Sequence, residues 1–89
     1  MDEHGYPTKE ELEKIKNWDY RDFGRLMEYV ESLWKYGGNF WEEFGNTYSI
    51  STGGWSGNED IIEALGSNTI FWLLHWQQSS RGGHYIFKK

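Results

Sequence analysis

A change of residue pattern near Tyr36 constrains the fold of this chain more than any other feature. Before this residue, apolar side chains recur every three to four positions, which is the period of a helix with one buried face. Beyond it lie nine of the eleven glycines and most of the aromatic and β-branched residues, and the period shifts towards two, as in strands. The pattern predicts a helical first part followed by a part that contains a sheet.

A capping box marks the start of the first helix. Thr8 and Glu11 follow Pro7 at the spacing at which each side chain satisfies a free backbone N–H group of the first turn. We expect the helix to run from there to about Trp18. The polar residues before it, 1–7, are expected to be flexible.

The second helix carries the strongest periodicity in the chain. We expect it to start at Asp19 or Asp22, either of which can cap it, and to end at Gly37-Gly38, because glycine tolerates the left-handed conformation of a helix end. One face at helical spacing holds its apolar residues: Phe23, Leu26, Met27, Val30, Leu33 and Trp34. This face is predicted to be buried.

A β-hairpin is expected next in the chain. Residues 40–44 and 47–52 flank Gly45-Asn46. This dipeptide suits the positive φ angles of a two-residue hairpin turn. The two flanking segments are therefore predicted to pair as antiparallel strands.

A glycine-rich turn at residues 53–58 leads into a short predicted helix. Residues 59–65 begin with acidic side chains, which the positive end of a helix dipole favours. Gly66 is expected to end this helix.

Residues 69–77 are dense in large apolar side chains and are long enough for either a buried strand or a helix. Their aromatic content and the turn that follows favour a strand, with Trp72 and His75 in the core. Residues 79–83 are expected to form a hairpin loop and residues 84–89 the last strand. The order is ααββαββ: one α+β domain over residues 1–89, with helices packed on an antiparallel sheet of about four strands.

The aromatic content is high for a small domain. Six Trp, six Tyr and five Phe stand among 89 residues, and each can remove about 150 to 250 Å² from water. One small core is not expected to hold them all. Because large exposed apolar patches are uncommon on monomers, the surplus predicts a ligand pocket or a subunit interface, and a homo-oligomer, most simply a dimer.

Charge and the absence of cysteine exclude several classes of protein. Nine basic and 14 acidic residues give a net charge of -5, which disfavours binding to duplex DNA or to an anionic membrane by Coulomb attraction. Without Cys there are no disulfides, thiolate zinc sites or cysteine nucleophiles. Neither a membrane span nor a signal peptide is evident, so a soluble cytoplasmic protein without cofactor or metal is expected.

The turn Gly53-Gly54-Trp55-Ser56-Gly57-Asn58 is the first candidate site. Free N–H groups at a helix start can bind a phosphate or carboxylate, and Ser56 and Asn58 can donate further hydrogen bonds. The spacing matches neither the phosphate-binding loop nor the dinucleotide fingerprint. Glu59 and Asp60 repel an anion unless they point away. The alternative is a structural role, with Asn58 as a cap.

The second candidate site lies in the last predicted hairpin. Residues 67–89 contain three basic residues and no acid. Trp76 and Arg81 offer a ring for stacking and a guanidinium for phosphate. His84 and Tyr85 offer polar groups beside them.

Our leading hypothesis joins both segments in one pocket that sequesters a small phosphate-bearing nucleotide without catalysis. The residues assigned to it are Trp55, Ser56, Gly57, Asn58, Trp76, Arg81, His84 and Tyr85. The two tryptophans would stack on the base, Arg81 and the helix-start N–H groups would hold the phosphate, and the other side chains would bind polar edges.

Two other function classes stay open. A protein–protein inhibitor could use an acidic helical face with exposed aromatic residues; the acids are Glu10, Glu11, Glu13, Asp19, Asp22, Glu28 and Glu31. Six basic residues on the same part of the chain favour an ordinary solvated face instead. A hydrolase would need a group such as His84, and no catalytic motif accompanies it.

The segments Gly53-Gly54-Trp55-Ser56-Gly57-Asn58-Glu59 and Ser79-Ser80-Arg81-Gly82-Gly83-His84-Tyr85 resemble an uncharacterised family of small bacteriophage and prophage proteins. The similarity covers about residues 40–87 and brings no established activity with it. It implies an accessory protein that acts on host defence. Such a protein would either capture a nucleotide signal or inhibit a host defence protein or nucleic-acid enzyme.

Overall fold

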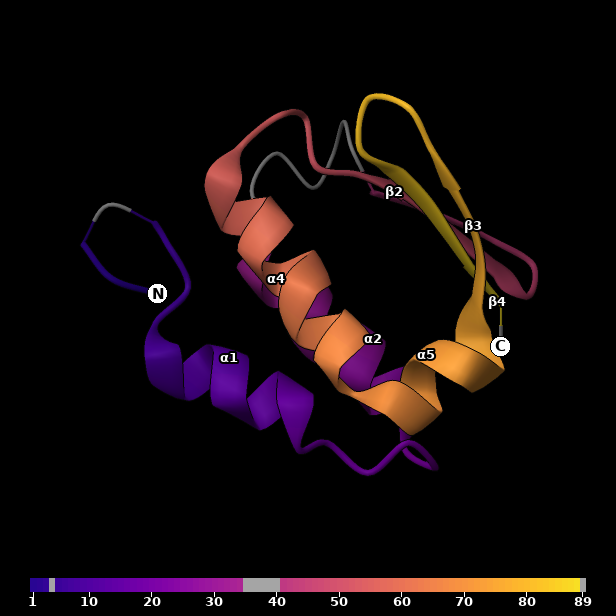
Figure 1. Cartoon of the computed structure of the whole chain (residues 1–89), viewed down its shortest axis with the longest axis horizontal. Coiled ribbons are helices and arrows are strands. Elements are labelled where there is room, and N and C mark those ends of the chain that lie inside the picture. The colour runs from indigo at the N-terminus through magenta and orange to yellow at the C-terminus, as the bar shows by residue number, and fades with distance from the viewer. Residues whose placement is uncertain (4, 35–40, 89) are drawn as a thin grey trace.

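The computed structural model of the chain describes residues 1–3, 5–34 and 41–88, and it confirms the predicted α+β fold (Figure 1). The helices are α1 (Lys9–Lys16), α2 (Phe23–Leu33), α4 (Ser56–Ser67) and α5 (Thr69–His75). The strands are β1 (Trp41–Phe44), β2 (Thr47–Ser51), β3 (Trp76–Ser80) and β4 (His84–Lys88). They form one antiparallel sheet in the order β1-β2-β4-β3, and the helices lie on one side of it.

The predicted capping box starts α1. The Glu11 N–H donates to Thr8 Oγ1 at 3.1 Å, and the Thr8 N–H donates to Glu11 Oε1 at 2.8 Å. The ammonium of Met1 lies 2.6 Å from the same carboxylate. Burial opposes ionisation of Glu11, but the hydrogen bonds from the ammonium and Thr8 outweigh it and lower the pKa of the carboxyl. The start of α1 thus holds the N-terminus beside it.

The apolar face of α2 is buried as predicted, and the helix ends at Leu33. Trp34 follows in extended conformation, is itself buried, and donates from Nε1 to the Ser51 carbonyl at 3.0 Å. This bond joins the end of α2 to the end of β2. The predicted helix end at Gly37-Gly38 and the predicted strand start at residue 40 lie outside the described residues.

The first hairpin has the predicted two-residue turn. Phe44 pairs with Thr47 across it, and Gly45 has a φ of 59°, which a residue without a side chain adopts readily. On its other side, β2 pairs with β4 and not with β3, the next strand in the sequence.

Aromatic rings join the helices to the inner face of the sheet. Phe71 of α5 is fully buried and lies 5.7 Å from the ring of Phe23 on α2 and 5.6 Å from that of Phe87 on β4, measured between centroids. Phe23 also meets Tyr48 of β2 edge to face at 5.6 Å. These four rings form the centre of the core.

The strand predicted for residues 69–77 is wrong, because α5 occupies most of this segment and β3 begins only at Trp76. Helical spacing places Phe71 and His75 on one face, where both rings contact Phe23, at 5.7 and 3.9 Å. The unbroken apolar run was compatible with either structure, and tertiary contact with α2 decides for the helix. The element order is therefore ααββααββ.

The predicted bounds of the preceding helix are also wrong: α4 begins at Ser56 rather than at residue 59 and runs past Gly66 to Ser67. The helix can start early because Gly57 has no side chain, so that the Trp55 ring lies where a Cβ would stand. At its other end, Asn68 donates from Nδ2 to the carbonyls of Ile15 (3.1 Å) and Trp18 (2.9 Å). This buried amide separates α4 from α5 and attaches them to the end of α1.

The last hairpin turns later than predicted, because Ser79 and Ser80 belong to β3. Gly82 and Gly83 have φ angles of 84° and 78°, which make the turn. Gly83 also lies so close to Thr52 that a Cβ there would overlap its side chain. The end of this hairpin therefore lies against the segment that leaves β2.

Candidate functional site

A shallow, open cleft of about 530 Å³ lies along α1 and the loop that leads to α2. Most of the residues that line it are charged or polar: Glu10, Glu13, Lys14, Asn17, Trp18, Asp19 and Asp22. The four carboxylates in this set all belong to the acidic helical face expected from the sequence. The cleft thus gives that face a concave part.

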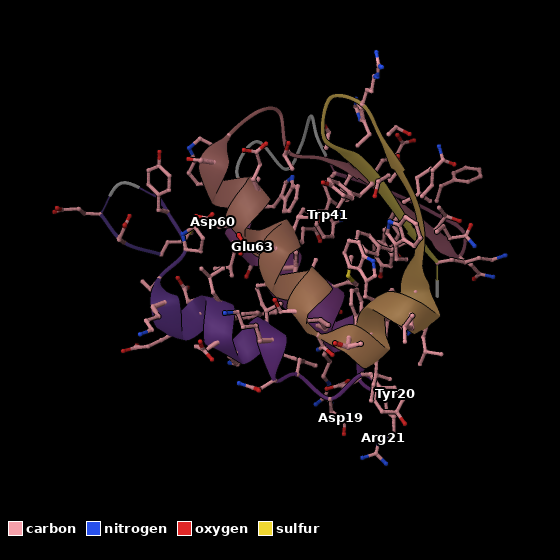
Figure 2. All side chains as sticks on the ribbon, in the orientation of Figure 1. Asp19, Tyr20, Arg21, Trp41, Asp60 and Glu63 are labelled. Carbon is pink, nitrogen blue, oxygen red and sulfur yellow. The ribbon has the colours of Figure 1, made fainter. Side chains whose placement is uncertain are left out.

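Local hydrogen bonds hold the loop that forms one wall of the cleft. Trp18 donates from its indole Nε1 to the Asp22 carbonyl at 3.2 Å. Asp19 accepts from the Arg21 backbone N–H at 2.9 Å and from the Arg21 guanidinium at 2.9 and 3.1 Å. Figure 2 shows this Asp19–Arg21 pair at the outer end of the loop. The hydrogen bonds from Arg21 hold the pKa of Asp19 at about 2.

An aromatic pair with a cation on it stands at the same place. Trp18 stacks on Tyr29 of α2, with ring centroids 5.4 Å apart. The ammonium of Lys14 lies 5.5 Å from the Trp18 ring centroid and 4.7 Å from that of Tyr29. Burial, with a smaller contribution from Glu11, raises the pKa of the Tyr29 hydroxyl. The faces of the Trp18 and Tyr29 rings attract positive charge, and the Lys14 ammonium of the same chain lies over both.

The other carboxylates of the cleft are weakly engaged. Glu13 lies 3.6 Å from the Lys16 ammonium and Asp22 lies 4.0 Å from Arg25 Nε, with both pairs largely exposed. Such surface pairs contribute little stability. Glu10 has no ion pair with any described residue. A cation from a partner can therefore compete for these groups.

A smaller cavity of about 120 Å³ lies between α1 and α4. Leu12 and Lys16 line it from α1, and Asp60, Glu63 and Ala64 line it from α4. Figure 2 shows Asp60 and Glu63 on the side of α4 that faces α1. The acidic surface therefore continues from α1 onto α4.

The residues predicted to bind phosphate at the turn before α4 are partly covered. Trp55 is half-buried, lies over Gly57, and contacts the Tyr6 ring at a centroid distance of 4.9 Å. Gly57 and Asn58 are buried, and Asn58 donates from Nδ2 to the Thr52 carbonyl at 3.2 Å. This bond fits the structural alternative considered for Asn58. Ser56 is exposed at the first position of the helix.

The residues predicted in the last hairpin lie at two separate places. Arg81 is exposed in the turn, and its guanidinium makes no ion pair or hydrogen bond with a described residue. His84 is exposed at the start of β4 and Tyr85 is half-buried beside it. Trp76 lies at the other end of β3, where its ring stacks on Trp72 with a centroid distance of 5.8 Å.

The structure brings the two predicted glycine-rich turns together but leaves Trp76 away from them. The Thr52 N–H donates to the Gly83 carbonyl at 3.0 Å, and Ser51 pairs with His84. Trp76 instead pairs with Phe87, three residues farther along β4. The eight residues of the predicted pocket therefore do not converge on one point.

Sequence reasoning missed the aromatic part of the cleft. Trp18 was expected only as the end of the first helix, and Lys14 was given no role. The local signal that could have pointed to them is the pair Trp18-Asp19 directly after a helix, at the start of a turn closed by an Asp side chain. Contact of Trp18 with Tyr29 depends on how α1 and α2 pack, which spacing along one helix does not show.

Comparisons with protein-family models, with curated proteins and with solved structures gave no match. The resemblance to small bacteriophage proteins stays a prediction.

Among residues 1–3, 5–34 and 41–88, no helix is long and apolar enough to cross a membrane. Within the same residues, His, Asp and Glu side chains form no group of three or more that could hold a metal ion.

Proposed function

We propose that this protein is a non-catalytic inhibitor of a partner protein, and that its cleft along α1 takes a basic side chain of that partner. The observation that carries the proposal is the lining of the cleft, to which four carboxylates contribute together with Trp18. Carboxylates bind a guanidinium or ammonium by charge-assisted hydrogen bonds. The ammonium of Lys14 already lies over the rings of Trp18 and Tyr29, so the carboxylates are the groups that would hold the partner's cation.

The charge of the chain before residue 67 supports a basic partner. Residues 1–66 contain 14 acids and 6 bases. A surface with this excess steers positively charged partners towards it and raises the rate of association. On the resemblance to small bacteriophage proteins, we propose that the partner is a host defence protein or a nucleic-acid enzyme, whose basic surface the inhibitor covers.

The test is a titration with a triarginine peptide, followed by ¹⁵N NMR. Binding should shift the amide signals of residues 10–22, and a tricitrulline peptide of the same shape without charge should not. Glu10→Gln/Glu13→Gln should weaken binding at least about tenfold, because two carboxylates of the cleft are lost.

The matched control is Glu28→Gln/Glu31→Gln. It removes two exposed carboxylates at the same spacing on α2, and neither of them lines the cleft. Equal weakening by both double variants would show a diffuse charge effect and would contradict a site at Trp18.

Sequestration of a small phosphate-bearing nucleotide is the second candidate, and one observation favours it. Arg81 is exposed and unpaired among the described residues, at the end of the molecule where the two glycine-rich turns meet. Calorimetric titration with cyclic and linear nucleotides tests this function. Micromolar binding lost in Arg81→Ala and retained in Arg25→Ala would favour it, and absence of heat for the whole panel would exclude it.

A further inference from the structure

Among the described residues that line the cleft along α1, Lys14 alone is basic. Its side chain is exposed and makes no ion pair or hydrogen bond with a described residue, although four carboxylates line the same cleft. The ammonium lies instead 5.5 Å from the Trp18 ring centroid and 4.7 Å from that of Tyr29. Both distances are within the range of a cation–π contact. The chain thus places a cation of its own on the aromatic part of the cleft.

The two rings are the fixed partners of this contact. Trp18 stacks on Tyr29 at a centroid distance of 5.4 Å, and its indole Nε1 donates to the Asp22 carbonyl at 3.2 Å. Both rings are half-buried. The ammonium of Lys14, by contrast, stands at the end of a flexible four-carbon stem on the surface of α1. The ammonium is therefore the movable partner.

A cation that entered the cleft would be repelled by Lys14 at the ring faces. Two positive charges about 5 Å apart repel each other, so a second cation gains the attraction of the rings only after the first has left. The attraction that the partner's cation gains there is offset by the attraction that Lys14 loses. The rings consequently add little to the binding of an external cation.

The carboxylates of the cleft are open to such a cation. Glu10 has no ion pair with any described residue. Glu13 lies 3.6 Å from the Lys16 ammonium, and Asp22 lies 4.0 Å from Arg25 Nε, in pairs that are largely exposed. Carboxylates bind a cation most strongly when it donates hydrogen bonds to them. The cleft therefore favours a cation that carries N–H groups.

A guanidinium meets this requirement best. It is planar and has five N–H donors, which match the oxygens of a carboxylate in pairs. The wall of the cleft contains such a pair, since Arg21 donates from Nε to Asp19 Oδ1 at 3.1 Å and from Nη2 to Asp19 Oδ2 at 2.9 Å (Figure 2). A trimethylated ammonium has no N–H donor, and its recognition depends on ring faces. In this cleft, Lys14 covers those faces.

We propose that Lys14 is a specificity-determining residue of the cleft. Its ammonium closes the Trp18–Tyr29 pair to external cations, so that the cleft selects an arginine side chain of the partner and rejects a fully methylated lysine. This inference rests on the proposed function and deepens it by naming the residue through which the partner is anchored.

Titration with two peptides of equal charge, followed by ¹⁵N NMR, tests the inference. The wild type should bind triarginine at least about tenfold more tightly than tri(trimethyllysine), because the second peptide donates no side-chain hydrogen bonds to the carboxylates. Lys14→Met keeps a long apolar stem and removes the ammonium. It should raise the affinity for tri(trimethyllysine) at least about fivefold and shift the Trp18 indole N–H signal on binding.

Lys9→Met is the matched control. It removes the same charge from an exposed position of α1 that does not line the cleft, so it should raise the affinity for tri(trimethyllysine) less than twofold. Equal binding of both peptides by the wild type, or equal gains in both variants, would overturn the inference and leave the proposed function in place. A wild type that does not bind triarginine would overturn the proposed function, and the inference with it.

Discussion

The helical side formed by α1 and α2 and the segment formed by α5 and β3 expose different kinds of side chain to water. On the helical side, many of the exposed side chains are charged, and an arginine or lysine lies near several of the acids. In the α5–β3 segment, aliphatic and uncharged polar groups are exposed instead, Leu73 at 77%. One chain of 89 residues thus carries two surfaces of different chemistry.

The exposure of a surface alone therefore does not indicate what kind of partner it binds. The acidic surface is hollowed beside Trp18 and suits a partner of opposite charge. The uncharged surface ends in a strand at the edge of the sheet. Beyond the experiments above, three substitutions test how sharply the two regions differ.

The largest effect is expected inside α5. Phe71 is fully buried against Phe23 and Phe87, so Phe71→Ala should lower the free energy of unfolding by about 3 to 5 kcal/mol. Leu73→Ala, on the exposed face of the same helix, should change it by less than about 0.5 kcal/mol. Urea unfolding measures both. Equal losses would contradict the assignment of Phe71 to the buried face of α5 and Leu73 to its exposed face.

A moderate effect is expected at Asn68, which joins the two regions. Its buried amide donates to the Ile15 and Trp18 carbonyls, so Asn68→Ala should cost about 1 to 3 kcal/mol of unfolding free energy by leaving both without this donor. Asn17→Ala removes an exposed bond to the Glu13 carbonyl and should cost less, because water replaces the donor. Urea midpoints at unchanged slope check the order. The reverse order would contradict the role of Asn68.

The smallest effect is expected on the charged side. Arg21→Ala should raise the pKa of Asp19 from about 2 towards its ordinary value of 3.8. Since the folded-state pKa is depressed, the stabilisation by this pair is present above the ordinary pKa and is lost as the pH falls from there towards about 2. NMR titration of the Asp19 carboxyl measures the shift. Arg25→Ala should leave it unchanged, and an equal shift there would mean that overall charge sets the value.

Local signals predicted the parts of the fold that depend on neighbouring residues. The capping box of Thr8 and Glu11 and the turn at Gly45-Asn46 are confirmed, because each is formed by hydrogen bonds and φ angles within four residues. The segment 69–77 was assigned wrongly, because an unbroken apolar run satisfies a strand and a helix equally. Only contact of Phe71 and His75 with Phe23 distinguishes them.

The candidate site could be predicted in its charge but not in its shape. The acids of the cleft were recognised as part of an acidic helical face, since charge is visible in composition. Trp18 was not recognised, because its stacking partner Tyr29 belongs to another helix. The ligand pocket or subunit interface expected from the surplus of aromatic residues stays a prediction; Tyr6, Tyr20, Phe44 and Trp76 are described rings that are exposed.

The amino-acid sequence was enough for the class of fold, the start of α1, the first hairpin and the separation of an acidic part from a last part without acids, because these follow from local geometry and composition. Tertiary structure alone decided that α5 is a helix, that Trp18 meets Tyr29 under Lys14, and that β3 forms an edge of the sheet. The reason is physical: burial and strand pairing join residues far apart in the chain, and their free energy depends on which surfaces meet rather than on residue order.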